Sequence, residues 1–139
     1  MLTSNEIMAF LATANPGEAI MFYRDRLGLR LVADTEFALE FEAGDQPTPL
    51  RVQKVPAVAP APYTVLGWRV GNIEEEVDAL AKRGIGFSRF EGLAQDARGI
   101  WTAPDGTRVA WFKDPDGNLL SLTRPVPGAA TSESTQPIT

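Results

Sequence analysis

The stretches AFLATANPGEAIMFYRDRLGL (9–29) and LGWRVGNIEEEVDALAKRGI (66–85) contain the same features in the same order. Each begins with a short apolar run that is typical of a strand. An asparagine follows, Asn15 or Asn72, and this residue type often caps the start of a helix. Apolar residues then recur at helical spacing. The chain is therefore predicted to contain an internal repeat, in which a strand is followed by a helix.

The ends of the two expected helices also match. A glutamate stands three residues after each asparagine, Glu18 or Glu75, as in a capping box. Each helix is expected to end at a glycine, Gly28 or Gly84, which readily adopts the left-handed conformation of a helix C-cap. Both expected helices thus have a start and a stop signal.

Strand-like runs follow each expected helix. They are 29–34, 37–43 and 50–55 in the first half, and 85–90, 99–103, 108–113 and 119–123 in the second half. The motifs PDGT (104–107) and DPDGN (114–118) predict hairpin turns between the last three runs. This order predicts an α+β fold of two tandem βαβββ modules. A helix covers only one face of each sheet, so the other face must meet a partner module or a ligand.

The expected boundaries follow from composition. We assign 1–57 to the first module, 58–63 to a proline-rich extended linker and 64–125 to the second module. The segment 126–139 ends in a small, polar, aperiodic run and is expected to be a disordered tail.

Composition limits the chemistry. The 139 residues include no cysteine and no histidine, so disulfides, thiolate-bound zinc and histidine general bases are excluded. The formal net charge of −5 argues against a nucleic-acid-binding protein, which needs a basic face. The N-terminal segment has neither the basic start of a signal peptide nor a long apolar run, so we expect a cytoplasmic protein that does not bind membranes.

Three motifs carry a resemblance to a known family. They are residues 15–19 leading into FYRDRLGL (22–29), then VGNIEEEVDALAKRGI (70–85), then FKDPDGNLLSL (112–122). In this order they resemble the vicinal oxygen chelate superfamily, which includes glyoxalase I, bleomycin-resistance proteins and extradiol dioxygenases. The resemblance implies two modules whose curled mixed sheets surround a central cavity, and it implies a homodimer.

Metal-using members of that family place their ligands on particular strands. By resemblance, the two first-strand positions fall at Met8 and Val65, and the last-strand glutamate falls at Ser121. The fourth-strand glutamate falls at either Arg51 or Gln53. A thioether, an aliphatic side chain and a neutral hydroxyl are poor ligands for the metals concerned. We therefore expect no metal and no other cofactor, and metal-dependent glyoxalase or dioxygenase activity is not supported.

Strand alternation suggests which residues share a side with these positions. The expected ligand-binding residues are Met8, Phe10, Gln53, Val65, Arg69, Val109, Trp111 and Ser121. Trp111 should lie opposite Ser121 if Lys113 pairs with Leu119. Met8, Phe10, Val65 and Trp111 could instead fill a core.

Arg69 would be the main charged group of this pocket, because a charge on a buried face must be paired or bind something. It either forms an ion pair with Glu40 or Glu42, or it selects an anionic or carbonyl-bearing ligand. No pair of carboxylates has a spacing that forces proximity, so no catalytic residue is named.

The leading functional hypothesis is a metal-independent small-molecule binding protein that sequesters or senses a drug or metabolite. One alternative is a lyase, isomerase or hydrolase that works without a transition metal in the same cavity. Another is a structural dimerisation module whose cavity is filled by its own side chains. The sequence does not name the ligand, nor whether the cavity forms within one chain or across two.

Overall fold

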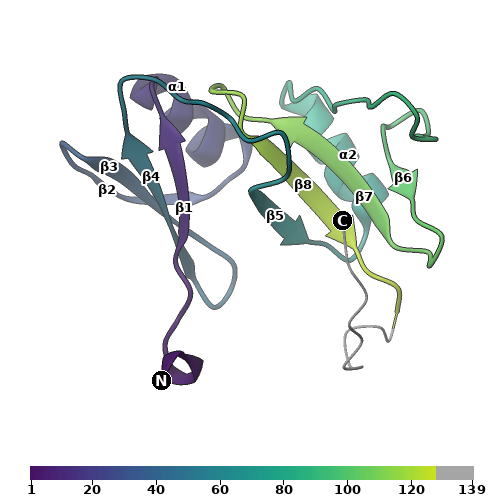
Figure 1. The fold of residues 1–139 in the computed structure, drawn as a ribbon, viewed down its shortest axis with the longest axis horizontal. Coiled ribbons are helices and arrows are strands. Elements are labelled where there is room, and N and C mark those ends of the chain that lie inside the picture. The colour runs from purple at the N-terminus through teal and green to yellow at the C-terminus, as the bar shows by residue number, and fades with distance from the viewer. Residues whose placement is uncertain (128–139) are drawn as a thin grey trace.

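The computed structural model describes residues 1–127, which form two four-stranded sheets (Figure 1). The first has the order β1-β4-β3-β2, with strands β1 (Ala9–Thr13), β2 (Arg30–Asp34), β3 (Ala38–Ala43) and β4 (Thr48–Lys54). The second has the order β5-β8-β7-β6, with strands β5 (Leu66–Arg69), β6 (Trp101–Thr102), β7 (Arg108–Lys113) and β8 (Leu119–Arg124). A short 3-10 helix, η1 (Leu2–Ser4), precedes β1.

Both sheets have the same topology. The first strand of each module pairs parallel to the last, β1 with β4 and β5 with β8, and the remaining pairs are antiparallel. A helical segment follows the first strand in each module. The predicted α+β fold of two βαβββ modules is therefore confirmed. The stretch 55–65 between the sheets contains no helix or strand and includes the expected linker. Most of the expected disordered tail, 128–139, lies outside the described residues.

The helix of the first module changes its winding part-way along. The segment α1 (Pro16–Ile20) is α-helical and η2 (Met21–Arg26) is a π-helix. The N–H of Leu27 donates to the carbonyl oxygen of Phe22, five residues earlier, at 2.9 Å. Because such wide turns are rare, helical spacing alone did not predict this one.

The predicted glycine caps are present, since Gly28 and Gly84 have φ values of 81° and 89°. Helix α2 (Ile73–Lys82) also begins as predicted, because the Asn72 side chain accepts from the N–H of Glu75 at 3.1 Å. Asn15 is the N-cap residue of α1, as predicted, but its side chain makes no capping hydrogen bond. Its side-chain amide instead donates to Asp116 at 3.0 Å.

The strand predicted over 85–90 is also wrong. Phe87 forms only an isolated bridge with Phe112. Beyond it, the side chain of Gln95 holds the chain as a loop: it accepts from the N–H of Phe90 and donates to the carbonyl oxygens of Ser88 and Gly99, at 2.8–2.9 Å. These bonds occupy backbone groups that a sheet would need.

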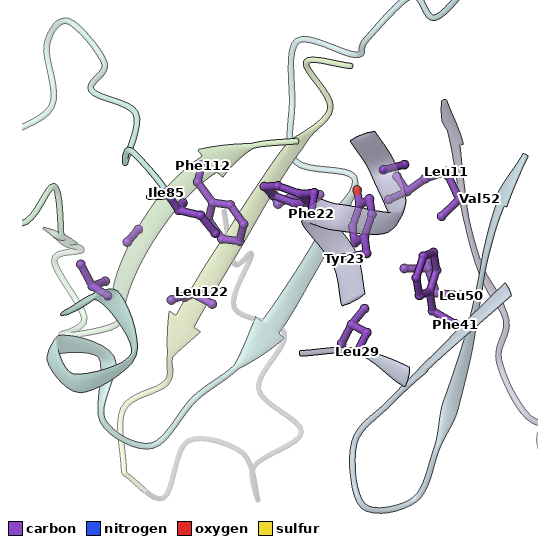
Figure 2. Close-up of a cluster of buried hydrophobic side chains, with 14 of the residues drawn as sticks. Leu11, Phe22, Tyr23, Leu29, Phe41, Leu50, Val52, Ile85, Phe112 and Leu122 are labelled. Carbon is purple, nitrogen blue, oxygen red and sulfur yellow. The ribbon is translucent and has the colours of Figure 1, made fainter. Parts of the chain in front are cut away.

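The two modules share one apolar core. Figure 2 shows Phe22 and Tyr23 of η2 between the two sheets, with Leu11 and Val52 on one side and Phe112 on the other. Tyr23 and Phe112 are fully buried, and the rings of Phe22 and Phe112 lie 6.3 Å apart. The helix of the first module thus packs against both sheets, so each module completes the core of the other.

The DPDGN turn between β7 and β8 connects the modules. The carboxylate of Asp116 accepts from the hydroxyl of Thr13, and from the N–H of Ala14 at 2.9 Å. The side chain of Asn118 donates to the carbonyl oxygen of Ala12 at 3.0 Å. A motif predicted only as a hairpin turn therefore also fixes the end of β1, about a hundred residues earlier.

No helix within residues 1–127 is long and apolar enough to cross a membrane.

Candidate functional site

Each sheet has one face that is not covered by its helix, and most of the predicted site residues lie on these two faces. We call them the first open face (Phe10, Ala12, Glu40, Arg51 and Gln53) and the second open face (Val65, Gly67, Val109, Trp111 and Ser121). The alternate residues of the same strands, such as Leu11, Val52 and Leu120, belong to the shared core.

The first open face combines an aromatic ring with an ion pair. Phe10 is 53% exposed and lies in register beside Arg51 on β4. Arg51 is in turn opposite Glu40 on β3, and its guanidinium lies 3.0 Å from that carboxylate. Both charged side chains are partly exposed, so the pair contributes little to stability.

The remaining residues predicted in the first module lie close to this row. Gln53 is exposed and pairs in register with Ala12. Met8, the residue before β1, is 46% exposed. Arg51 and Gln53, between which the sequence left the fourth-strand position open, are two residues apart and face the same way. The first open face therefore presents apolar, amide and paired charged groups together.

The second open face has the predicted register. Trp111 pairs with Ser121, and Lys113 pairs with Leu119. Ser121 in turn neighbours Gly67 on β5. A Cβ atom on Gly67 would lie 2.7 Å from the Ser121 hydroxyl oxygen, so glycine leaves room for that hydroxyl.

Part of the second open face is covered by the chain itself. Trp111 is only 7% exposed because the ring of Phe90 packs edge-on against it at 5.2 Å, and Trp101 lies 6.1 Å away. Val109, Leu119 and Leu93 also belong to this small cluster. Sequence reasoning missed Phe90 because a strand was predicted where the chain folds back as a loop. It also missed Trp101, although β6 lies within a predicted strand and pairs Trp101 with Val109. Towards β5 the face is open, and Val65 is 39% exposed.

Arg69 differs from its expected environment. It lies at the end of β5 and is exposed rather than buried. The ion pair with Glu40 or Glu42 that we considered is not formed, because Glu40 pairs with Arg51 and Glu42 pairs with Arg30. Within residues 1–127, Arg69 forms no ion pair.

The predicted lining residues are thus divided between two sheets. Met8, Phe10 and Gln53 belong with the first, and Val65, Val109, Trp111 and Ser121 belong with the second. The shared core lies against the opposite side of each sheet. In a single chain these residues form two surfaces, and a shared pocket among them would require a further surface.

Comparison with known proteins identifies the family. The model of the Glyoxalase/Bleomycin resistance protein/Dioxygenase superfamily matches residues 5–122. The chain belongs to this superfamily. Comparison with curated protein sequences gives no match.

Solved structures share the fold at low sequence identity. A superfamily member from Sphaerobacter thermophilus is 22% identical, with a TM-score of 0.70 over 90% of this chain and 100% of that one. TnmS3, an antibiotic binding protein from Streptomyces sp. CB03234, is 24% identical, with a TM-score of 0.67 over 91% and 99%. The bleomycin resistance determinant encoded on transposon Tn5 is 21% identical, with a TM-score of 0.67 over 87% and 98%.

The metal positions implied by the family are not filled by suitable donors in this chain. Met8, Val65 and Ser121 offer a thioether, an alkyl group and a neutral hydroxyl. At the fourth-strand position, Arg51 carries a positive charge and Gln53 a neutral amide. Within residues 1–127 there is also no group of three or more carboxylates placed to hold an ion. These residues do not fit the family's metal centre.

Proposed function

We propose that this protein is a metal-independent small-molecule binding protein of the glyoxalase/bleomycin-resistance type, which sequesters or senses a drug or metabolite. The first open face carries the proposal. It presents the exposed ring of Phe10 on β1 in register with Arg51 on β4. Gln53 lies two residues after Arg51 on β4.

Physical chemistry favours a ligand that covers Phe10. Covering an exposed aromatic ring contributes about 25 cal/mol of binding free energy for each square ångström of apolar surface removed from water. A flat ligand can also stack on the ring. Because Arg51 is already paired with Glu40, the polar part of the face is close to neutral and offers both donors and acceptors. This suits a largely apolar ligand with carbonyl and hydroxyl groups better than a strongly charged one.

Two structural relatives support the ligand class. TnmS3 is described as an antibiotic binding protein, and the Tn5 protein as a bleomycin resistance determinant. A drug-like natural product is therefore our proposed ligand for this chain. An enzyme that works without a metal remains the alternative, in which a bound compound would be converted.

We further propose a cytoplasmic homodimer. Leu2 and Ile7 in the segment before β1 are largely exposed, and Met8 and Phe10 beside them are about half exposed. Such a run of apolar groups is typical of a surface that meets a partner. A second copy that covers this segment would also supply a wall opposite the first open face. A monomeric mass in light scattering at micromolar concentration would contradict the dimer.

The binding proposal is tested with a thermal-shift screen of natural products, since any compound that binds the native state raises its stability. Hits are then measured by calorimetry on Phe10→Ser and on Phe37→Ser. Phe37 is the matched control, because it is equally apolar and 69% exposed in the β2–β3 turn.

We expect Phe10→Ser to weaken binding and Phe37→Ser to leave it unchanged. Equal affinity in both variants would place the ligand elsewhere. A screen without hits, in a protein that is nevertheless dimeric, would favour the structural dimerisation module. If mass spectrometry shows that the protein converts a bound compound into a product, the enzyme alternative would be favoured.

A further inference from the structure

A crevice lies against the second sheet, on the side opposite the second open face. It has a volume of about 240 Å³ and is bordered by the helix-facing side of that sheet, by α2 and by the residue that follows η2. Its lining residues are Leu27, Trp68, Arg69, Val70, Glu76, Leu80, Phe112 and Leu122. None of the positions implied by the family for metal ligands belongs to this crevice.

The floor of the crevice is aromatic and aliphatic. The rings of Trp68 and Phe112 are stacked, with centroids 6.3 Å apart and an angle of 19° between their planes. Phe112 is fully buried, whereas Trp68 is only half-buried and so keeps part of its indole open to the crevice. Leu80 and Leu122 provide further apolar contact. An apolar body, and a flat ring in particular, fits this floor.

The rim of the crevice carries two charged residues. Arg69 and Glu76 are both exposed, and neither forms an ion pair with another residue of the described chain. The guanidinium of Arg69 is a rigid fork of donors that matches a carboxylate. Glu76 disfavours a second negative charge close by, because like charges repel.

We propose that this crevice binds a small apolar monocarboxylic acid, whose ring or short chain packs on Trp68 while its carboxylate binds Arg69. The site is independent of the open faces. Trp68 belongs to the shared core, whereas Trp101 and Trp111 belong to the separate cluster on the other side of the same sheet.

The three tryptophans allow the two sides of the sheet to be observed separately. We would titrate the ¹⁵N-labelled full-length protein with phenylacetate and follow the indole N–H signals by NMR, with the Trp68 signal assigned from Trp68→Phe. We expect the Trp68 signal to shift with half-saturation at about 1 mM, which is the affinity available to so small a ligand. The Trp101 and Trp111 signals should stay in place. Phenylacetamide should bind more weakly because it lacks the charge, and phenylmalonate because it carries two.

Arg69→Gln tests the charged contact and, because Arg69 is exposed, should leave the fold intact. It should weaken phenylacetate binding by about tenfold, as expected for a lost charge-assisted hydrogen bond. Arg24→Gln is the matched control, since Arg24 is an exposed arginine that is not part of the crevice.

Three results would overturn the proposal: no saturation below about 10 mM, equal shifts of all three indole signals, or unchanged affinity in Arg69→Gln. Phe10→Ser should leave the Trp68 titration unchanged. The proposal for the crevice and the proposal for the first open face are therefore tested independently of each other.

Discussion

The hydroxyl of Tyr23 donates a hydrogen bond of 2.6 Å to the carboxylate of Asp114, which joins the helix of the first module to the DPDGN turn of the second. Both side chains are buried. Asp114 also accepts from the N–H groups of Asp116 and Asn118, at 2.9 Å each. One carboxylate therefore holds the turn in shape and holds the turn against the other module.

Tyr23→Phe should test this contact with little change in volume. Because the lost bond is buried and its acceptor is charged, we expect the free energy of unfolding to fall by about 1.5–3 kcal/mol. Tyr63→Phe is the control: Tyr63 is largely exposed, and its change should stay within about 0.5 kcal/mol. Urea unfolding followed by tryptophan fluorescence measures both. Equal stability of the two variants would mean that the bond contributes nothing.

The same contact predicts a dependence on pH. Burial, and then the nearby Asp114 carboxylate, raise the pKa of Tyr23 above its ordinary value of 10.0. Below pH 10 the phenol is protonated in both states and its contribution is complete. As the pH rises further, the unfolded phenol ionises while the folded one keeps its proton, so stability falls by about 1.4 kcal/mol for each pH unit.

Tyr23→Phe lacks this ionisation. The stability difference between the natural protein and Tyr23→Phe should therefore narrow above pH 10 and stay constant below it. Urea unfolding of both proteins at intervals from about pH 8 to 11 measures the difference. A difference that stays constant across that range would show that the phenol ionises equally easily in both states.

Two Pro-Asp-Gly turns in the second module provide a matched pair of aspartates. The carboxylate of Asp116 accepts from Thr13, Ala14 and Asn15 of the first module. Among residues 1–127, Asp105 accepts only within its own turn, from the N–H of Thr107 at 2.8 Å. Asp116→Ala should therefore cost about 2 kcal/mol more than Asp105→Ala, measured as the free energy of unfolding. Similar costs would mean that both aspartates serve only their turns.

Features that depend on neighbouring residues could be predicted from the sequence. The repeat, the Asn72 cap and the glycine ends at Gly28 and Gly84 rest on contacts within one turn of helix. The register that sets Trp111 opposite Ser121 follows from the turn residues between them.

Features that depend on distant residues could not be predicted. Asn15 has the right position for a cap, but its side-chain amide donates a hydrogen bond to Asp116, 101 residues away. Trp111 is buried because a loop held by Gln95 folds over it. Arg69 lies at the end of its strand, yet nothing within residues 1–127 buries it there. Direction is a local property of a strand, whereas burial depends on what the rest of the chain brings to it.

The metal content of the purified protein is a separate prediction. We expect far less than one equivalent of nickel, zinc, iron or manganese, because the ligand positions that the family resemblance implies hold Met8, Val65 and Ser121, and the chain has no histidine or cysteine. Elemental analysis after dialysis against a chelator measures this. A full equivalent that survives dialysis would mean that the ligands lie at positions other than those we assigned.

Gly67 should be intolerant of a side chain for a reason specific to this sheet. A Cβ atom there would lie 2.7 Å from the hydroxyl oxygen of Ser121, closer than normal contact allows. We expect Gly67→Ala to lower the free energy of unfolding by about 1–3 kcal/mol, the usual cost of overpacking. In the background of Ser121→Ala, where the hydroxyl is absent, the same substitution should cost at least about 1 kcal/mol less. Urea unfolding of the four proteins in this cycle measures the coupling, and the absence of coupling would show that the strands separate to admit the new methyl group.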